Sequence, residues 1–506
     1  VAGFAPCYDI AGNLLFQHGM DGGDRWMLPD AAGKPMYAWD VNDRLTDDGE
    51  TILERRTFFT ACDGLRRPVE QRLRIEGGPW LVISRLIYGD QLAVPADARA
   101  RNLRGVLHEL HDPAGVVTSV RADFKGNVTE LERRLVRDVQ APVVSWSDAT
   151  AELLEPEVFG RLVEHDALGR ITRLYNWHRD PARVVVCEPR YSERGLLVGQ
   201  DVVVRASRTG SGYAGGTRIP AISAIRYNAK GQRERVSLGN GTMTRQEFDP
   251  VTFRVRRIRT TRPDADPPFP ATRAALRDPR IVQQLSYTFD AVGNVTEVFD
   301  EAYEPVFFRN QEVEPRSAYT YDALYRLTEA TGREHVTAIA PEREELGAID
   351  ADFPIGDRAL RTYGQFYDYD AAGNLVELAH RAVGGDWTRH YEYATSSNRL
   401  ERTWLGTDEL GAVRHAYDRH GSMANLENVA VEFQTRWAYR DMIRSRNLGG
   451  GGWAYYNYAS DKQRTRKVIR RRDGSTQWER LYLGGTEVYR SYTPAGELDE
   501  AIATHH

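Results

Sequence analysis

The sequence has few cysteines and no long apolar runs. Its three cysteines, Cys7, Cys62 and Cys187, are odd in number and widely spaced, so they predict neither a disulfide framework nor a CxxC metal site. No stretch approaches the roughly 18 consecutive apolar residues of a transmembrane helix, and the first residues do not have the pattern of a signal peptide. We therefore expect burial and strand pairing to hold the fold together.

The sequence also lacks an excess of charge of either sign and the Leu- and Ala-rich runs of long helices. Lysine and arginine number 67 and aspartate and glutamate 72, which leaves a net charge of −5. Such a balance gives no electrostatic attraction to nucleic acid or to an anionic membrane surface. Aromatic residues, by contrast, make up 10% of the chain, and 25 residues are tyrosine, which suits half-exposed faces of β-sheets. The composition favours a β-rich protein.

One phrase recurs along the whole chain: an aromatic residue, Asp, two further residues, Gly, a polar residue and an aliphatic one. The clearest copy is Tyr369–Leu375, and close copies are Tyr8–Leu14 and Phe289–Val295. Looser copies occur at His165–Ile171, Tyr227–Arg233, Tyr321–Leu327 and Asp63–Pro68. A phrase repeated this often indicates architecture before chemistry.

Each copy has the chemistry of a hairpin turn. Asp accepts hydrogen bonds from backbone N–H groups a few residues on, and Gly three residues later supplies the positive φ of a type I turn with a following bulge. The aromatic residue ends one strand and the aliphatic residue begins the next. An ordinary β-sandwich with similar turns is the alternative, and the irregular spacing does not suit a strict solenoid. The number of copies favours an all-β fold, a long antiparallel sheet of hairpins with few short helices.

The pattern predicts a single repeat region over residues 1–506. We expect it to be a fragment of a longer chain, because its first residue is Val and a turn phrase begins already at Tyr8. A first repeat block spans 1–262 and a second spans 282–506. Between them, residues 263–281 are rich in proline, which disrupts both helices and strand ladders, and form the best candidate for a linker.

Two parts of these blocks are less typical of hairpins. Residues 96–160 are the least β-like, and a short helix or turn is predicted within each of 96–107, 131–140 and 148–158. Residues 333–360 are acidic and interrupted by proline, and we interpret them as a surface excursion.

Few patterns in the sequence point to chemistry. Gly210–Gly215 matches GxGxxG, but the following Gly216–Pro220 cannot start the helix that a dinucleotide site needs, so a glycine-rich hairpin loop is favoured. His108 and His111 have no third zinc ligand nearby and are interpreted as a surface pair. Acidic residues alternate in two places without the Gly and Glu of an EF-hand; they are Asp264, Asp266, Asp350 and Asp352.

No catalytic site emerges from the remaining patterns. The basic run Arg464–Arg472 alternates charged and apolar residues, which favours a solvated strand over a nucleic-acid patch. There is no P-loop, no HExxH motif and no GxSxG elbow. A pair of carboxylates sharing one cleft, as glycosidases use, can be neither found nor excluded among 72 acidic residues.

The repeated phrase resembles the signature of the YD-repeat family, also called Rhs repeats, and the resemblance covers essentially the whole chain. Seven stretches are similar to the Rhs region of toxin-complex B/C-type and SpvB-related bacterial toxin proteins: Leu28–Pro35, Thr60–Pro68, Leu153–Phe159, Tyr227–Gly241, Phe307–Pro315, Tyr319–His335 and Leu481–Tyr489. The resemblance implies that the hairpin sheet curls into a spiral, hollow shell, part of a cocoon, which encloses a C-terminal toxic domain until delivery.

The resemblance also implies what would surround this segment. These 506 residues do not include the family's SpvB-like region, its β-propeller, or the core segment whose paired Asp residues release the toxin, so no autoproteolytic residue is carried over. The implied partners are those remaining parts of the shell, the enclosed toxin domain and a toxin-complex pore subunit. Nucleic-acid binding and membrane insertion are not implied.

We therefore expect a structural encapsulation segment of a secreted virulence protein. It is expected to be no enzyme and to have no catalytic, cofactor-binding or metal-binding residues. The alternative is an extracellular carbohydrate-binding or adhesion protein of the YD-repeat type. That alternative predicts exposed aromatic clusters at loop tips near Trp387, Trp404 or Trp453, whereas packing within the sheet is the competing explanation for each Trp.

Overall fold

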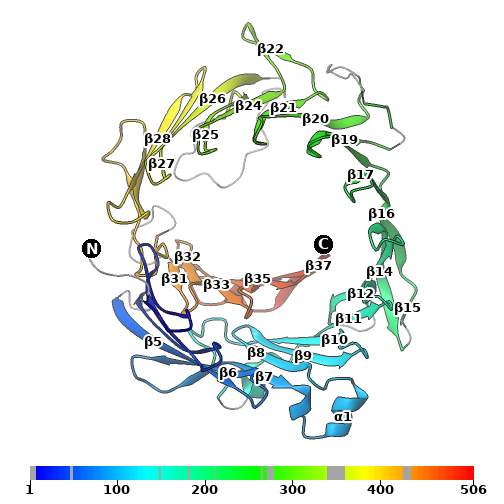
Figure 1. Ribbon diagram of the computed structural model, residues 1–506, viewed down its shortest axis with the longest axis vertical. Helices are drawn as coiled ribbons and strands as arrows, with labels where there is room; N and C mark the ends of the chain where they lie inside the picture. Colours follow the sequence, from blue (N-terminus) through cyan, green and yellow to red (C-terminus); the bar gives the residue numbers. More distant parts are fainter. Residues whose placement is uncertain are drawn as a thin grey trace. The chain divides into compact units, whose positions relative to one another are not determined.

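The computed structural model describes residues 7–45, 50–147, 150–179, 183–210, 212–263, 266–269, 278–338, 359–425 and 435–506 (Figure 1). Within these ranges the chain forms 37 β-strands, two short α-helices and one 3-10 helix. Antiparallel pairing joins 28 strands into one sheet, while β31–β37 form a second sheet and β22–β23 a separate hairpin. The predicted all-β class, with a long antiparallel sheet of hairpins and few short helices, is confirmed.

The chain divides into two compact units, each assembled from separate segments. Unit 1 comprises Val1–Glu188, Val203–Thr217 and His415–His506, and unit 2 comprises Pro189–Val202 and Arg218–Arg414. The two repeat blocks drawn from the sequence, with their boundary at 263–281, stay a prediction.

The elements of unit 1 are β1 (Cys7–Tyr8), β2 (Leu14–Gly19), β3 (Gly23–Pro29), β4 (Pro35–Leu45), β5 (Thr51–Cys62), β6 (Pro68–Ile75), β7 (Leu81–Tyr88), η1 (Gly89–Gln91), α1 (Pro95–Ala100), β8 (Leu107–Asp112), β9 (Gly115–Ala122), β10 (Val128–Leu135), α2 (Thr150–Leu153), β11 (Phe159–His165), β12 (Ile171–His178), β15 (Gly212–Ala214), β31 (Thr435–Trp437), β32 (Ile443–Asn447), β33 (Trp453–Tyr458), β34 (Arg464–Arg470), β35 (Thr476–Leu483), β36 (Thr486–Tyr492) and β37 (Leu498–His505).

The elements of unit 2 are β17 (Arg233–Leu238), β18 (Met243–Phe248), β19 (Val255–Thr261), β20 (Ile281–Phe289), β21 (Val295–Asp300), β22 (Val306–Phe308), β23 (Gln311–Val313), β24 (Arg316–Tyr321), β25 (Leu327–His335), β26 (Leu360–Tyr369), β27 (Leu375–Ala382), β28 (Trp387–Tyr393), β29 (Leu400–Leu405) and β30 (Val413–Arg414). Three strands have residues in both units: β13 (Val184–Tyr191), β14 (Leu197–Thr209) and β16 (Thr217–Tyr227).

The hairpin between β26 and β27 shows how the repeated phrase forms a turn. The Asp370 carboxylate accepts hydrogen bonds from the backbone N–H of Asn374 at 2.8 Å and from its side-chain amide at 2.9 Å. The backbone closes at the same time, with Gly373 N–H donating to the Asp370 carbonyl at 3.1 Å and Gly373 at φ 93°. Tyr369 and Leu375 then pair across the strands next to a bulge. The turn chemistry predicted from the phrase is confirmed, and it extends to a fourth residue.

The same carboxylate or amide bond to the backbone N–H four residues on recurs with distances of 2.8–3.0 Å. It is made by Asp9, Asp30, Asp63, Asp123, Asp166, Asn228, Asp290, Asp322, Asp370 and Asp418. In two turns the Gly position holds another residue, and Arg66 and Tyr325 take a positive φ of 61° and 63° there. The turn therefore imposes the left-handed backbone even on side chains that disfavour it.

Neighbouring turns on the same edge of the sheet are hydrogen-bonded to each other. The Arg326 guanidinium donates to the Asp370 carbonyl, Gln232 donates to the Phe253 carbonyl at 2.9 Å, and Lys34 donates to the Arg66 carbonyl. Each donor is the polar residue that follows the Gly position of its own turn. The residue that ends one turn thus also fixes the next turn.

The aromatic residue of the phrase reaches in the opposite direction. The Tyr369 hydroxyl donates to the Leu327 carbonyl at 2.8 Å, and the Tyr321 hydroxyl donates to the Val295 carbonyl at 2.7 Å. In both cases the acceptor is the first strand residue after the preceding turn. The repeat of Tyr and Asp is therefore one structural device, in which Asp closes its own turn and Tyr ties it to the turn before.

Two of the three predicted helices are present. Helix α1 begins one residue before the predicted range 96–107, and helix α2 lies within 148–158. The prediction of a helix or turn within 131–140 is wrong for residues 131–135, because β10 extends to Leu135, and no helix follows at 136–140. Arg133 and Leu135 alternate with more exposed residues and are buried, at 6% and 1% exposure. Burial of one face against neighbouring strands outweighs the local helix preference here. The excursion predicted at 333–360 contains the ends of β25 and β26, and its residues 339–358 lie outside the described residues.

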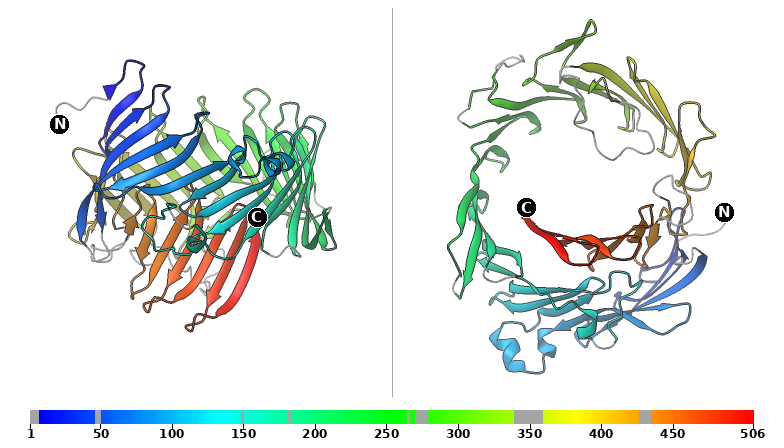
Figure 2. Two further views of the ribbon diagram at one scale, coloured as in Figure 1. Left: turned by 90° about the horizontal axis from the view of Figure 1, so that it is seen from below. Right: turned by 180° about the vertical axis from the view of Figure 1, so that it is seen from behind.

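Unit 1 has two layers, since the sheet β31–β37 packs against strands of the long sheet (Figure 2). Leu481, Leu483 and Val488 of the smaller sheet form a buried cluster with Leu135 and Phe159. In unit 2, by contrast, the described residues form no such cluster, and most of its strands are half-exposed on both faces. Among the described residues, no helix has the length and apolar character needed to cross a membrane.

A buried ion network also joins the two layers of unit 1. Glu479, whose side chain is 2% exposed, accepts from Arg466 at 2.5 Å, from Arg490 at 3.2 Å and from the Tyr492 hydroxyl at 2.7 Å. The two arginines in turn bond to Glu155 and Glu157, in the segment between α2 and β11, each at 2.7 Å. Burial raises the pKa of Glu479. Arg466, the Tyr492 hydroxyl and Arg490 lower it by more than burial raises it, so the pKa lies below its usual range.

The turn geometry predicts opposite effects for two exchanges at the Gly position. Tyr325→Gly is expected to raise the free energy of unfolding by about 0.5–1 kcal/mol, because it relieves an exposed side chain held at positive φ. Gly373→Ala is expected to lower it by about 1 kcal/mol. Urea unfolding followed by circular dichroism measures both, with Ala323→Gly as the control for glycine entropy, expected to destabilise. A loss of stability in Tyr325→Gly would contradict the account of the turn.

The ion network predicts a large effect of removing its central carboxylate. Glu479→Ala is expected to lower the free energy of unfolding by about 3–5 kcal/mol, because Arg466 and Arg490 stay buried without their partner. Since the folded pKa is below 4.5, the Glu479 contribution is present above about pH 4.5 and is lost as pH falls through the folded pKa.

Glu487→Ala serves as the control, because Glu487 pairs with the half-exposed Arg480 at 3.2 Å and should contribute less than about 1 kcal/mol. Denaturant unfolding between pH 3 and 7 separates the two variants. Equal losses in both would show that the network is no stronger than a surface pair.

Candidate functional surfaces

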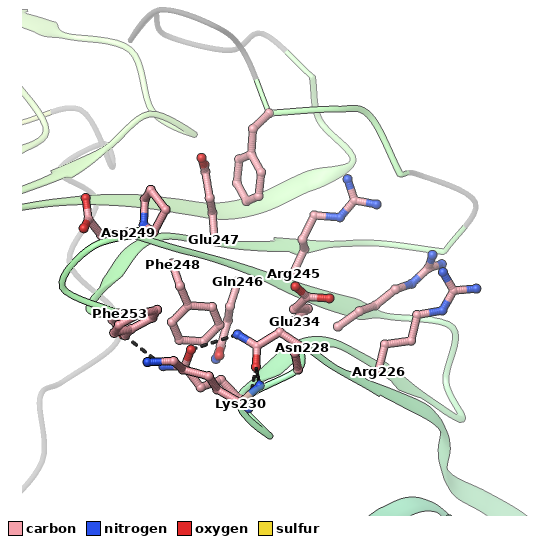
Figure 3. Close-up of a pocket in the computed structure, with 15 residues that line it drawn as sticks. Arg226, Asn228, Lys230, Glu234, Arg245, Gln246, Glu247, Phe248, Asp249 and Phe253 are labelled. Carbon is pink, nitrogen blue, oxygen red and sulfur yellow. Dashed lines mark hydrogen bonds between the residues drawn. The ribbon is translucent and has the colours of Figure 1, made fainter.

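One open site in unit 2 with both charged and aromatic side chains is a groove of about 660 Å³ along β17 and β18 (Figure 3). Arg226, Lys230, Arg245, Glu247 and Phe253 lie along it. Acidic and basic side chains alternate around the groove and Phe253 stands at one end, as Figure 3 shows. The groove therefore has the residue types for binding, and their contacts decide whether they are available.

Several of these polar groups already serve the turns at the end of the groove. The Asn228 side-chain oxygen accepts from the backbone N–H of Lys230 and Gln232, each at 3.0 Å. The Asp249 carboxylate likewise accepts from the backbone N–H of Val251 at 2.9 Å. Groups held in this way fix the backbone and do not act as an acid and base on a substrate.

Part of the predicted linker forms the other border of the groove. Asp266 pairs with Arg245 at 2.9 Å and with Arg235 at 3.1 Å. The carbonyls of Pro267 and Pro268 accept from the Arg259 guanidinium, and the Phe269 ring lies 4.6 Å from it. Residues 266–269 are thus fixed on the sheet, while 264, 265 and 270–277 lie outside the described residues.

In unit 1 the turn Asp418–Gly421 is clamped onto β3 and β4. Asn42 donates to the Asp418 carboxylate at 2.9 Å and accepts from the His420 backbone N–H at 3.1 Å. A Cβ on Gly23 would lie 3.0 Å from the Arg419 carbonyl, so this close approach requires glycine. The clamp joins Asn42 and Asp418, which are 376 residues apart in the chain, so no local sequence pattern indicates it.

A buried His–Asp pair lies beside this clamp. His420 Nδ1 lies 2.8 Å from Asp441, which also pairs with Arg25 at 2.9 Å. Burial raises the pKa of Asp441, but His420 and Arg25 lower it by more, so the pKa is lowered overall. At nearby Asp40 the effect of burial is larger than that of Arg56 and His420, so the pKa of that carboxyl is raised. The His420 side chain is only 1% exposed. A general base has to reach the proton of its substrate, so this pair is suited to holding the clamp and not to catalysis.

The interpretation of His108 and His111 as a surface pair is wrong, because both are buried on β8, at 7% and 4% exposure. His108 contacts the Ser119 carbonyl at 2.9 Å, and the His111 ring meets Trp146 edge-on at 5.1 Å. One hydrogen-bonded nitrogen per ring makes such burial tolerable. Among the described residues no group of three His, Cys, Asp or Glu side chains is placed to hold a metal ion.

The other patterns singled out in the sequence also have structural roles. The hairpin predicted at 210–215 is confirmed, with Thr209 paired to Gly212 and no helix following, but residues 212–214 form strand β15 and not a loop. Of the alternating acidic residues, Asp266 pairs with Arg235 and Arg245, and Asp264, Asp350 and Asp352 lie outside the described residues.

The basic run forms β34, as predicted, but its Arg466 belongs to the buried network and is not solvated. Trp387, Trp404 and Trp453 lie on strands and not at loop tips. The first two stack on His380 and His390, with ring centroids 5.1 and 5.2 Å apart. Packing within the sheet therefore accounts for these Trp side chains.

Comparison with known proteins identifies relatives among bacterial toxins. No protein-family model matches the sequence. The chain is 26% identical over 506 residues to the toxin subunit YenC2 of Yersinia entomophaga, covering 96% of this chain and 49% of YenC2. It is 27% identical over 503 residues to YenC1 of the same organism, covering 94% of this chain and 46% of YenC1. The chain thus spans about half the length of the curated relatives it matches.

Solved structures share the fold over nearly the whole chain. The TcdB2-TccC3 complex gives a TM-score of 0.77 at 23% identity, covering 98% of this chain and 22% of that one. The Photorhabdus luminescens Tc holotoxin pore gives a TM-score of 0.78 at 23% identity, covering 98% of this chain and 21% of that one. Together, the hairpin repeat, the sequence relatives and the shared fold confirm the predicted resemblance of this chain to the YD-repeat region of toxin-complex B/C-type proteins.

Proposed function

We propose that this chain is a structural wall segment of a toxin-complex shell, which encloses a C-terminal toxic domain until delivery. The observation that carries the proposal is the long hairpin sheet, whose fold matches TcdB2-TccC3 over 98% of the chain. Similarity to two Yersinia toxin subunits supports the same role.

The architecture of unit 2 supports a wall in physical terms. Most of its strands are half-exposed on both faces, and its strands are held by ladder pairing and by bonds between turns. A sheet stabilised along its edges can extend without a packed core, whereas an enzyme needs a pocket with preorganised polar groups. The segment acts by enclosing and carries out no catalysis, and it uses no cofactor.

The surroundings of the segment follow from the same proposal. Its partners are the remaining parts of the shell, namely an SpvB-like region, a β-propeller and a core segment, together with the enclosed toxin domain. A solved structure similar to this chain is a holotoxin pore, which favours docking to a translocation pore subunit. The protein acts outside the producing cell. No observation favours the carbohydrate-binding alternative, because Trp387, Trp404 and Trp453 lie within strands.

Small-angle X-ray scattering of the monodisperse chain tests the wall. A compact globule of this length should have a radius of gyration of about 23 Å. A wall around an interior space predicts a clearly larger value and a distance distribution with its maximum shifted to long distances. A value near 23 Å with a symmetric distribution would overturn the proposal.

A further inference from the structure

The two faces of the sheet β31–β37 in unit 1 have different environments. Residues that alternate along β35 and β36 are buried on the face toward the long sheet, including Glu479, Leu481, Val488 and Arg490. The residues between them are half-exposed on the opposite face. None of the buried clusters of unit 1 includes a side chain of that second face, where Ala454 and Ile469 are buried among larger residues that stay partly exposed.

Cations and aromatic rings alternate on this open face. The register places Tyr456, Lys467, Arg480 and Tyr489 directly opposite one another on four adjacent strands. We call the open face, with its residues Arg446, Tyr456, Arg464, Lys467, Trp478, Arg480, Tyr482 and Tyr489, the cationic face. All of these residues come from β32–β36, which are hydrogen-bonded in one rigid sheet.

Positive charge exceeds negative charge on the cationic face. The register adds two carboxylates, Glu487, which pairs with Arg480 at 3.2 Å, and Glu500 on the edge strand β37. Burial lowers the pKa of Lys467, and Arg464, Arg480 and Arg446 lower it further by repulsion. The like charges are held together because the buried face fixes the strands, and an anionic partner would relieve the repulsion.

The aromatic rings of the face are already covered by cations. Arg464 lies 4.5 Å from the centroid of the Tyr482 ring, and Lys467 lies 5.1 Å from that of Trp478. A nucleic-acid base would have to displace these groups in order to stack, because single-strand binding relies on open ring faces. A carboxylate, in contrast, can approach the cations from the open side without moving them.

We infer that the cationic face of the sheet β31–β37 binds an acidic polypeptide segment in extended conformation. Lys467 and Arg480 are direct cross-strand neighbours on strands that lie about 4.8 Å apart. Carboxylates on alternate residues of an extended segment are about 7 Å apart, so two of them can contact these two cations. The inference rests on unit 1 alone and stands independently of the proposed shell function.

Fluorescence anisotropy with a labelled peptide of alternating glutamate and threonine tests the inference on the full chain. The peptide should bind, and Lys467→Gln with Arg480→Gln should weaken binding about tenfold. Lys462→Gln with Arg472→Gln is the matched control, because it removes the same charge from exposed turns of the same sheet. Its binding should change less than about twofold, and added salt should weaken binding to the wild type.

The single variant Lys467→Gln guards against loss of folding. It removes one of several like charges, so the circular dichroism spectrum and the thermal midpoint should stay unchanged. Binding of the peptide should still be weaker than to the wild type. The inference is overturned if both double variants bind equally, if a lysine–threonine peptide binds as tightly, or if no peptide binds. Tighter binding of oligothymidylate that is lost in Lys467→Gln would overturn it as well and assign the face to single-stranded nucleic acid. The scattering test is independent, because none of these outcomes depends on an enclosed volume.

Discussion

The hydrogen bonds of the turns are the constraint on which the long sheet depends. A sheet that is half-exposed on both faces gains little from burial, so its register has to be set by local contacts. Asp370 closes its own turn through Asn374, and Arg326 and Tyr369 join that turn to its neighbour in the chain of turns. Because each contact involves only adjacent hairpins, such a sheet can be extended or curved by adding hairpins, as in other repeat proteins.

The two units show what this local scheme can and cannot provide. Unit 2 combines it with buried polar contacts such as that of Gln284 with Glu301. Unit 1 adds the buried apolar cluster around Leu481 and the network around Glu479. A buried ion pair is an inefficient source of stability compared with apolar packing, but it specifies one arrangement of the layers. The network therefore suits a place where a second sheet must dock on the first in a single register.

Local chemistry was predictable from the sequence, and long-range packing was not. The turn at Asp370, the hairpin at 210–215 and the short helix α1 follow from residues a few positions apart. The buried state of His111 and the contact of Asn42 with Asp418 depend on residues far away in the chain. The strand that ends at Leu135 lacks a clear local signal for the same reason, since only its neighbours reveal which side is covered. Alternation alone does not show whether a second layer exists.

Strand β34 shows how stability and recognition are separated in such a fold. Arg466 points into the layer contact, where Glu479 and Glu155 hold it, and its loss would leave buried charge behind. Lys467, the next residue, lies on the open face with cations as its nearest charged neighbours. Because side chains of a strand alternate between faces, one residue can be fixed by folding while the adjacent one is free to meet a partner. A sheet of this construction can therefore vary the side chains of its open face without altering how its layers dock.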